Sequence, residues 1–166
     1  CQSFSAAGRR AGGAMGIKDR RGSLFIEYCR ILSHFNPKGF LFENVKGIIS
    51  SNRRQDWEEI KNEFRNLGYQ LFYRVLDAAE YGVPQHRERL ILVGLKDGTY
   101  KFPKPTHGPR STKLQPYVSA KESISDLQVA SEKIVPYGGK YGDLLMQVPP
   151  GLNYSFFTEK RNHPNP

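Results

Sequence analysis

Between residues 24 and 95, apolar residues alternate between the spacing of a helix and that of a strand, and this alternation limits the fold more than any other feature. Apolar positions three or four residues apart predict two amphipathic helices, the first beginning after Ser23 and the second stopped by Gly68. Short apolar and β-branched runs predict strands between and after the helices. The expected helices cover residues 24–35 and 57–67, and the expected strands cover residues 39–42, 69–76 and 90–95.

The order of these elements predicts an α/β fold with a doubly wound, Rossmann-like sheet. Helices that alternate with strands imply parallel strands joined by right-handed crossovers. The strands at 69–76 and 90–95 are an exception, because the residues between them leave no room for a helix. We therefore expect a mostly parallel sheet that contains one antiparallel strand pair.

The composition changes near residue 100, since nine of the eleven prolines lie beyond it. Residues 1–97 are predicted to form a compact α/β portion, and residues 98–166 a loop-rich portion with short elements. One such element is a short helix that begins at Ser119, where Ser119 and Glu122 have the spacing of a capping box.

Composition excludes several classes of protein. Leu, Ile, Val and Phe make up about a quarter of the 166 residues, which is too many for a chain that is disordered throughout. The sequence shows no membrane span, no signal peptide, no zinc-ligand spacing and no disulfide framework, because its two cysteines are Cys1 and Cys29. We expect a protein of the reducing cytoplasm with no membrane partner.

The net charge of +9 favours nucleic acid or another polyanion as a partner. The residues from position 3 to 22 are rich in glycine and carry a net charge of +4, and residues 101–113 hold four basic residues and no acid. A basic soluble protein without such a partner, and a solvated linker at 101–113, remain alternatives.

Three groups of polar residues are expected to meet at one edge of the sheet. If a strand precedes Cys1, this thiol and Glu43 both follow the carboxyl ends of parallel strands, where open α/β folds bind ligands. The antiparallel strand pair returns the segment from Gln85 to Arg89 to the same edge. Each group alone also has a structural interpretation: a buried cysteine, a turn after a strand, or a solvated strand edge.

Short motifs in the same order resemble those of the cytosine-C5 DNA methyltransferases. The family's Pro before the Cys is not in this chain, and the match is looser after residue 100. The matching segments are Cys1-Gln-Ser-Phe-Ser5-x-Ala7-Gly8, Arg21-Gly-Ser-Leu-Phe25, Glu43-Asn44-Val45, Gln85-x-Arg87-x-Arg89 and the tail from Val148 to Asn153 and His163 to Pro166. The tail resembles the start of the target-recognition region in bacterial members. The resemblance therefore implies that residues 1–97 are the second half of the catalytic α/β domain, and that residues 98–166 are a linker and the start of the target-recognition region.

The resemblance implies a methyl transfer from S-adenosylmethionine to C5 of a cytosine in double-stranded DNA. By resemblance, Cys1 adds to C6 of the base, Glu43 protonates N3, and Arg89 contacts the base. Arg87 belongs to the surrounding network, and Asn44 braces the Glu and the nucleophile loop. The base must first rotate out of the duplex, and a mobile, basic loop that closes over it suits residues 3–22.

The resemblance also implies contacts to the cofactor and to DNA. Leu24 is the expected neighbour of the cofactor. The residues expected to contact DNA are Gln2, Ser5, Arg9, Arg10, Arg21 and Gln85.

The chain lacks the Gly-rich segment that binds the cofactor in this family. We therefore expect the central piece of a bacterial or archaeal methyltransferase, inactive in isolation, with negligible affinity for S-adenosylmethionine. The strand that ends at Glu43 would expose an apolar edge and favour self-association. The sequence leaves open whether a cognate restriction endonuclease belongs to the same system.

Two other functions remain open. A non-catalytic nucleic-acid-binding module would account for the charge. The other is an amidohydrolase with Cys1 as its N-terminal nucleophile, although Cys1 opens a segment rich in Gly and Arg, whereas such enzymes begin on a buried strand.

Overall fold

The computed structural model divides the chain into two compact units, Cys1–Ser125 and Asp126–Pro166. The described part of the second unit includes one short helix, α5 (Gly142–Leu145). The structure describes residues 2–5, 22–127, 142–145, 147–149, 152 and 156.

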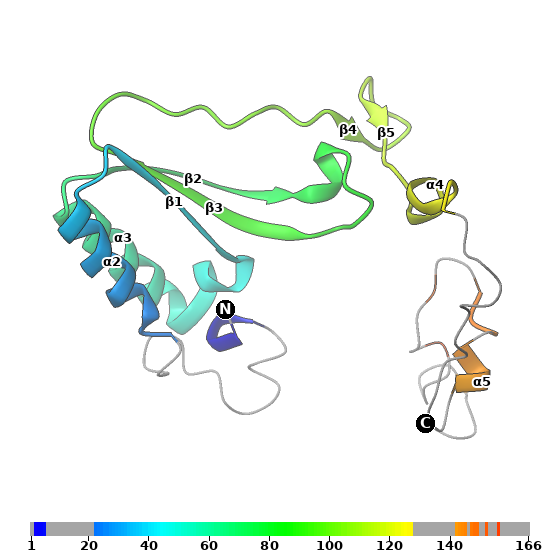
Figure 1. Cartoon of the computed structure of the whole chain (residues 1–166), viewed down its shortest axis with the longest axis horizontal. Coiled ribbons are helices and arrows are strands. Elements are labelled where there is room, and N and C mark those ends of the chain that lie inside the picture. The colour runs from blue at the N-terminus through cyan, green and yellow to red at the C-terminus, as the bar shows by residue number, and fades with distance from the viewer. Residues whose placement is uncertain are drawn as a thin grey trace. The chain divides into compact units, whose positions relative to one another are not determined.

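A three-stranded sheet forms the centre of the first unit (Figure 1). Its strands are β1 (Gly39–Val45), β2 (Gln70–Asp77) and β3 (Glu88–Leu95), in the order β1-β3-β2. The α/β class and the antiparallel pairing of β2 with β3 are confirmed.

The position of β3 corrects the expectation that parallel pairing would dominate this part of the sheet. Strands β1 and β2 run in the same direction, as a crossover helix requires, but β3 lies between them and pairs antiparallel with both. The hydrogen-bonded pairs of this sheet are therefore antiparallel. A strand that returns from a short connection can insert beside either neighbour, and the order of elements alone does not say which.

Two helices pack on the same face of the sheet (Figure 1). Helix α2 (Leu24–Phe35) and helix α3 (Gln55–Asn66) confirm the two predicted helices to within two residues at each end. Asn36 ends α2 in the left-handed region at φ 42°, and Gly68 adopts φ 84° just after α3. Ser23 occupies the N-cap position of α2, but its side chain forms no capping hydrogen bond.

Short elements that the sequence did not predict connect the main ones. The 3₁₀-helices η1 (Gln2–Phe4), η3 (Lys46–Arg54) and η4 (Ala78–Tyr81) lie near the chain start, after β1 and after β2. Strands β4 (His107–Gly108) and β5 (Gln115–Pro116) form a small parallel pair.

The short helix predicted after Ser119 is present as α4 (Ala120–Ile124). It begins with the predicted capping box, in which Ser119 and Glu122 each bond the other's backbone N–H.

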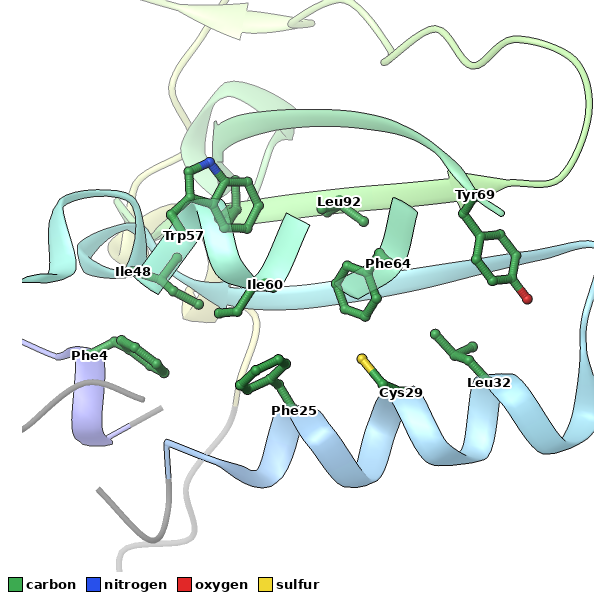
Figure 2. Close-up of a cluster of buried hydrophobic side chains, with 11 residues drawn as sticks. Phe4, Phe25, Cys29, Leu32, Ile48, Trp57, Ile60, Phe64, Tyr69 and Leu92 are labelled. Atoms are coloured by element: carbon green, nitrogen blue, oxygen red, sulfur yellow. The ribbon is translucent and has the colours of Figure 1, made fainter. Parts of the chain in front are cut away.

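The core lies between the sheet and the two helices (Figure 2). Phe64 of α3 is fully enclosed and contacts the rings of Tyr28, Phe40 and Phe42. Leu90 and Leu92 of β3 are also fully enclosed. Because side chains alternate along a strand, burial of these two leucines places Arg89 on the opposite face of the sheet.

Half of the apolar positions predicted for α2 lie at the surface. Phe25 and Leu32 are buried with Cys29, whereas Leu24, Ile31 and Phe35 are exposed. The helical spacing in the sequence therefore marks more apolar residues on α2 than the described neighbouring elements cover.

None of the helices in the described part of the chain combines the length and apolar composition of a membrane span.

The segment after β3 stays attached to the first unit. The hydroxyl of Tyr81 donates to the carbonyl of Pro103 at 3.1 Å, and the Thr106 N–H donates to the carbonyl of Glu80 at 2.9 Å. The change in composition near residue 100 thus falls inside this unit. A functional division at residue 97 stays a prediction.

Phe64→Ala should destabilise the fold by about 3–5 kcal/mol, because it removes a fully enclosed ring and leaves a cavity. Phe35→Ala is the matched control, because Phe35 is 73% exposed. Urea denaturation of both variants measures the difference. Equal losses of stability would show that the core does not centre on α3.

Candidate active site

The carboxylate of Glu43 on β1 and the guanidinium of Arg89 on β3 form an ion pair, with 2.9 Å between Oε1 and Nε. In the strand register, Glu43 lies opposite Ile91 and Arg89 lies opposite Val45, so the two charged residues are diagonal neighbours on one face. A second bond, from Nη1 of Arg89 to the carbonyl of Glu88 at 2.8 Å, also holds the guanidinium. The expected meeting of these two segments at one sheet edge is confirmed.

The ion pair remains in contact with solvent. The side chain of Arg89 is 25% exposed and that of Glu43 is 43% exposed. A carboxylate and a guanidinium that are both reachable can exchange this contact for hydrogen bonds to a planar ligand that offers a donor and an acceptor.

An open pocket of about 560 Å³ lies beside Arg89. Its charged lining is mostly cationic, because it includes Lys46, Arg87 and Arg89 but a single carboxylate, that of Glu88. Its lining residues are Phe4, Ser5, Val45, Lys46, Gly47, Ser50, Gln85, His86, Arg87, Glu88 and Arg89. The structure thus brings the predicted residues Ser5, Gln85, Arg87 and Arg89 together in one pocket.

Asn44 lies on the other side of β1 from Glu43 and is buried. Its Oδ1 accepts a hydrogen bond from the N–H of Val45 at 2.9 Å. It lines a second pocket of about 190 Å³, whose other lining residues are Phe4, Gly22, Leu24, Phe25, Tyr28, Phe42, Ile48 and Ile60. The predicted cofactor neighbour Leu24 is therefore at this smaller pocket, and the structure does not place it in the larger one.

The start of the chain reaches the larger pocket through η1. This element packs against η3, and Phe4 and Ser5 line the pocket. Gln2 lies in η1, where its backbone is described. The predicted nucleophile Cys1 and the predicted DNA contacts Arg9, Arg10 and Arg21 lie outside the described residues.

Four polar residues around this site were not assigned from the sequence. Lys46 and Glu88 form an ion pair at 2.6 Å, and Asp77 pairs with Nδ1 of His86 at 2.8 Å. The hydrogen bonds of Asp77 could have been predicted from the sequence, because an Asp at the end of a strand commonly accepts backbone hydrogen bonds from the following turn. The Lys46–Glu88 ion pair could not have been predicted, since it depends on the insertion of β3 beside β1.

Cys29 has the properties of a structural cysteine. It is buried in the core between α2 and α3, and burial, reinforced by Glu63, raises the pKa of its thiol to about 11. A thiol must ionise to act as a nucleophile. Within the described residues, no three His, Cys, Asp or Glu side chains gather as metal ligands would.

A family model for the C-5 cytosine-specific DNA methylases matches residues 1–147 of the chain. The chain belongs to this family. The chain is 40% identical over 149 residues to the Type II methyltransferase M.AquIA of Picosynechococcus, and the alignment covers 79% of this chain and 58% of the relative. It is 32% identical over 170 residues to the Type II methyltransferase M.NgoFVII of Neisseria gonorrhoeae, covering 99% of this chain and 44% of the relative.

The fold of this chain also has solved counterparts. The structure of the Entamoeba histolytica methyltransferase EhMeth superposes with a TM-score of 0.54 at 19% identity, over 82% of this chain and 39% of that one. At this identity, the likeness concerns the fold. The chain spans about half the length of the curated relatives it matches.

Cys29 should resist alkylation in the folded protein. With a pKa of about 11 in place of 9.0, its thiolate fraction at pH 8 is about 100-fold lower than that of an ordinary thiol, and burial slows the reaction further. Iodoacetamide labelling at pH 8, mapped by mass spectrometry, measures this protection. Labelling of Cys29 at the rate seen in urea would contradict it.

Proposed function

We propose that this chain forms the target-base half of a DNA (cytosine-5)-methyltransferase, in which the ion-paired Glu43 and Arg89 receive the cytosine. The observation that supports this most strongly is the 2.9 Å contact between them, because it joins two family motifs from different strands. Arg89 also lines the basic pocket, whereas Glu43 is not among its lining residues. Family membership supports the reaction class. The proposed substrate is double-stranded DNA.

The chemistry explains why a thiol and a carboxylic acid are needed together. C5 of cytosine is a poor nucleophile, so the thiolate of Cys1 first adds to C6 and forms a C–S bond. The electron pair of the C5=C6 double bond moves through the ring to N3, which takes a proton from the carboxylic acid of Glu43. The product is an enamine whose C5 carries the added electron density.

The enamine makes the methyl transfer and the release of the base possible. C5 forms a bond to the methyl carbon, the bond between that carbon and the donor sulfur breaks, and the electron pair of the broken bond stays on the sulfur. A base then removes the C5 proton, the C5=C6 double bond re-forms, and the C–S bond to Cys1 breaks. The thiolate is restored, and the proton on N3 returns to the carboxylate of Glu43.

Arg89 has the geometry to assist this proton transfer. Its guanidinium lies beside Glu43, and a planar donor suits the O2 edge of the same base. Arg87 is exposed in the pocket and is proposed to extend the network toward phosphate. Asn44 holds the end of β1 through its bond to Val45 and is proposed to brace Glu43 from behind.

The proposed methyl donor is S-adenosylmethionine, whose sulfonium supplies an activated methyl group. The smaller pocket, at about 190 Å³, is below the roughly 300 Å³ that encloses a small molecule. The described residues therefore fit one side of a donor site, with Leu24 and Phe25 as apolar contacts and Asn44 as a polar one. We propose that the isolated chain has negligible affinity for the donor.

DNA must reach this pocket with its target base outside the stack, because C6 and N3 are inaccessible in a duplex. The net charge of +9 and the cationic lining support contacts to phosphates. We propose DNA contacts at Gln2, Ser5 and Gln85, and at three arginines that follow η1 in the sequence, namely Arg9, Arg10 and Arg21. The Type II names of the relatives suggest a paired endonuclease as a further proposal.

A duplex with 5-fluorocytosine at the target should trap the full encoded protein covalently when S-adenosylmethionine is present. Fluorine cannot leave as a cation, so the adduct to Cys1 persists. Cys1→Ser should form no adduct, whereas Cys29→Ser, the matched control, should trap normally because Cys29 is buried. Denaturing gel electrophoresis measures the adduct. Trapping by the Cys1→Ser protein would remove Cys1 from its role, and duplex binding without an adduct would indicate a non-catalytic module.

Glu43→Gln should lower turnover by about 10²-fold or more, because the amide cannot deliver a proton to N3. Its affinity for the duplex should change little, since the shape and hydrogen-bonding capacity are kept. Glu59→Gln is the control, because Glu59 is exposed on α3. Radiolabelled methyl transfer and a duplex-binding titration separate the two quantities. An equal loss of rate and of binding would assign Glu43 a binding role.

A further inference from the structure

We propose that Asp77 is the positioning residue that sets Arg87 and Arg89 in place. This inference rests on the proposed function and names a residue that acts through these arginines without contact to the base. Asp77 is the last residue of β2, and η4 and the turn that follows connect it to β3. Its carboxylate bonds to both ends of this connection.

Three hydrogen bonds converge on the Asp77 carboxylate. Oδ1 accepts from the N–H of Arg87 at 2.8 Å and from the N–H of Ala79 at 3.2 Å, and Oδ2 pairs with Nδ1 of His86 at 2.8 Å. The N–H of Ala78 adds a backbone bond to the carbonyl of Arg87 at 3.2 Å. The connection is thereby closed one residue before β3 begins.

The environment of Asp77 favours its ionised form. The bond to His86 contributes most, and the bonds to the N–H groups of Arg87 and Ala79 add to it, so the pKa of the carboxyl lies below its ordinary value. The side chain is only 21% exposed, whereas that of His86 is 71% exposed. A shielded, charged acceptor holds backbone donors more strongly than a neutral one.

The bond to Arg87 fixes the strand register on which the site depends. Asp77 lies opposite Glu88, and Leu76 lies opposite Arg89, at the end of the β2–β3 ladder. A slip of one residue would turn Arg89 toward the helices and away from Glu43. The carboxylate opposes such a slip where the ladder would otherwise fray.

The His86 ring extends this arrangement toward the next segment. It contacts the ring of Tyr117 edge to face, with 5.2 Å between the centroids. Since His86 and Arg87 both line the larger pocket, Asp77 orients two adjacent pocket residues from behind.

The test compares Asp77→Ala and Asp77→Asn in the full encoded protein, with Asp97→Ala as the control because Asp97 is exposed at the other end of β3. Asp77→Ala should lower kcat by about 10²-fold, because displaced arginines impair the reacting geometry, and should raise the KM for DNA by a smaller factor, because Arg87 is proposed to face phosphate. Asp77→Asn keeps an oxygen that accepts both N–H groups, and its kcat should stay within about tenfold of the parent protein. Hydrogen exchange should show loss of protection at the Arg87 amide in Asp77→Ala alone.

Several results would overturn the inference. A lower Tm for Asp77→Ala with an unchanged kcat would show that Asp77 has a merely structural role. A fall in kcat for Asp77→Asn as large as that for Asp77→Ala would show that the hydrogen bonds accepted by this side chain do not position the arginines. An unprotected Arg87 amide in the parent protein would also reject it, even if Asp77→Ala failed to fold. A parent protein that neither methylates nor traps 5-fluorocytosine DNA would reject the proposed function, whereas a trapping parent with a fully active Asp77→Ala variant would reject this inference alone.

Discussion

The insertion of β3 between β1 and β2 is the constraint on which the site depends. Because β3 pairs antiparallel with both neighbours, its first residues meet the last residues of β1, and Arg89 comes within 2.9 Å of Glu43. If β3 lay at the outer edge of β2, the guanidinium would be one strand further from the carboxylate, about 4.8 Å more. The pairing order of the sheet thus determines whether the side chains of Glu43 and Arg89 can meet.

The alternation of side chains along the strands then separates packing from chemistry. Leu90 and Leu92 face the helices and are enclosed with Phe64, while Arg89 and Glu43 face away. The rigid core fixes the strands, and the opposite face stays open to solvent and ligand. Cys29, on helix α2, also belongs to the packed core, where burial raises the pKa of its thiol to about 11, and the proposal assigns the nucleophile to Cys1.

Sequence patterns predicted the local secondary structure better than they predicted which distant segments lie next to each other. Helical spacing, Gly68 and the Ser119–Glu122 capping box located helices and their ends, because these depend on residues a few positions apart. The meeting of Glu43 with the segment of Arg89 followed from chain direction alone. The placement of β3, the Lys46–Glu88 ion pair and the bonds of Asp77 did not follow, because they depend on contacts between distant segments. The roles of the site residues remain predictions.

In the proposed mechanism, a cytosine is held between Glu43 and Arg89 while Cys1 is bonded to it. A crystal structure of the full encoded protein trapped on a 5-fluorocytosine duplex tests this most directly. We predict a bond from Sγ of Cys1 to C6, with a Glu43 oxygen at hydrogen-bonding distance, about 3 Å, from N3 and the guanidinium of Arg89 at O2. A target base that stays stacked in the duplex, or one that is bound away from Glu43 and Arg89, would contradict the account.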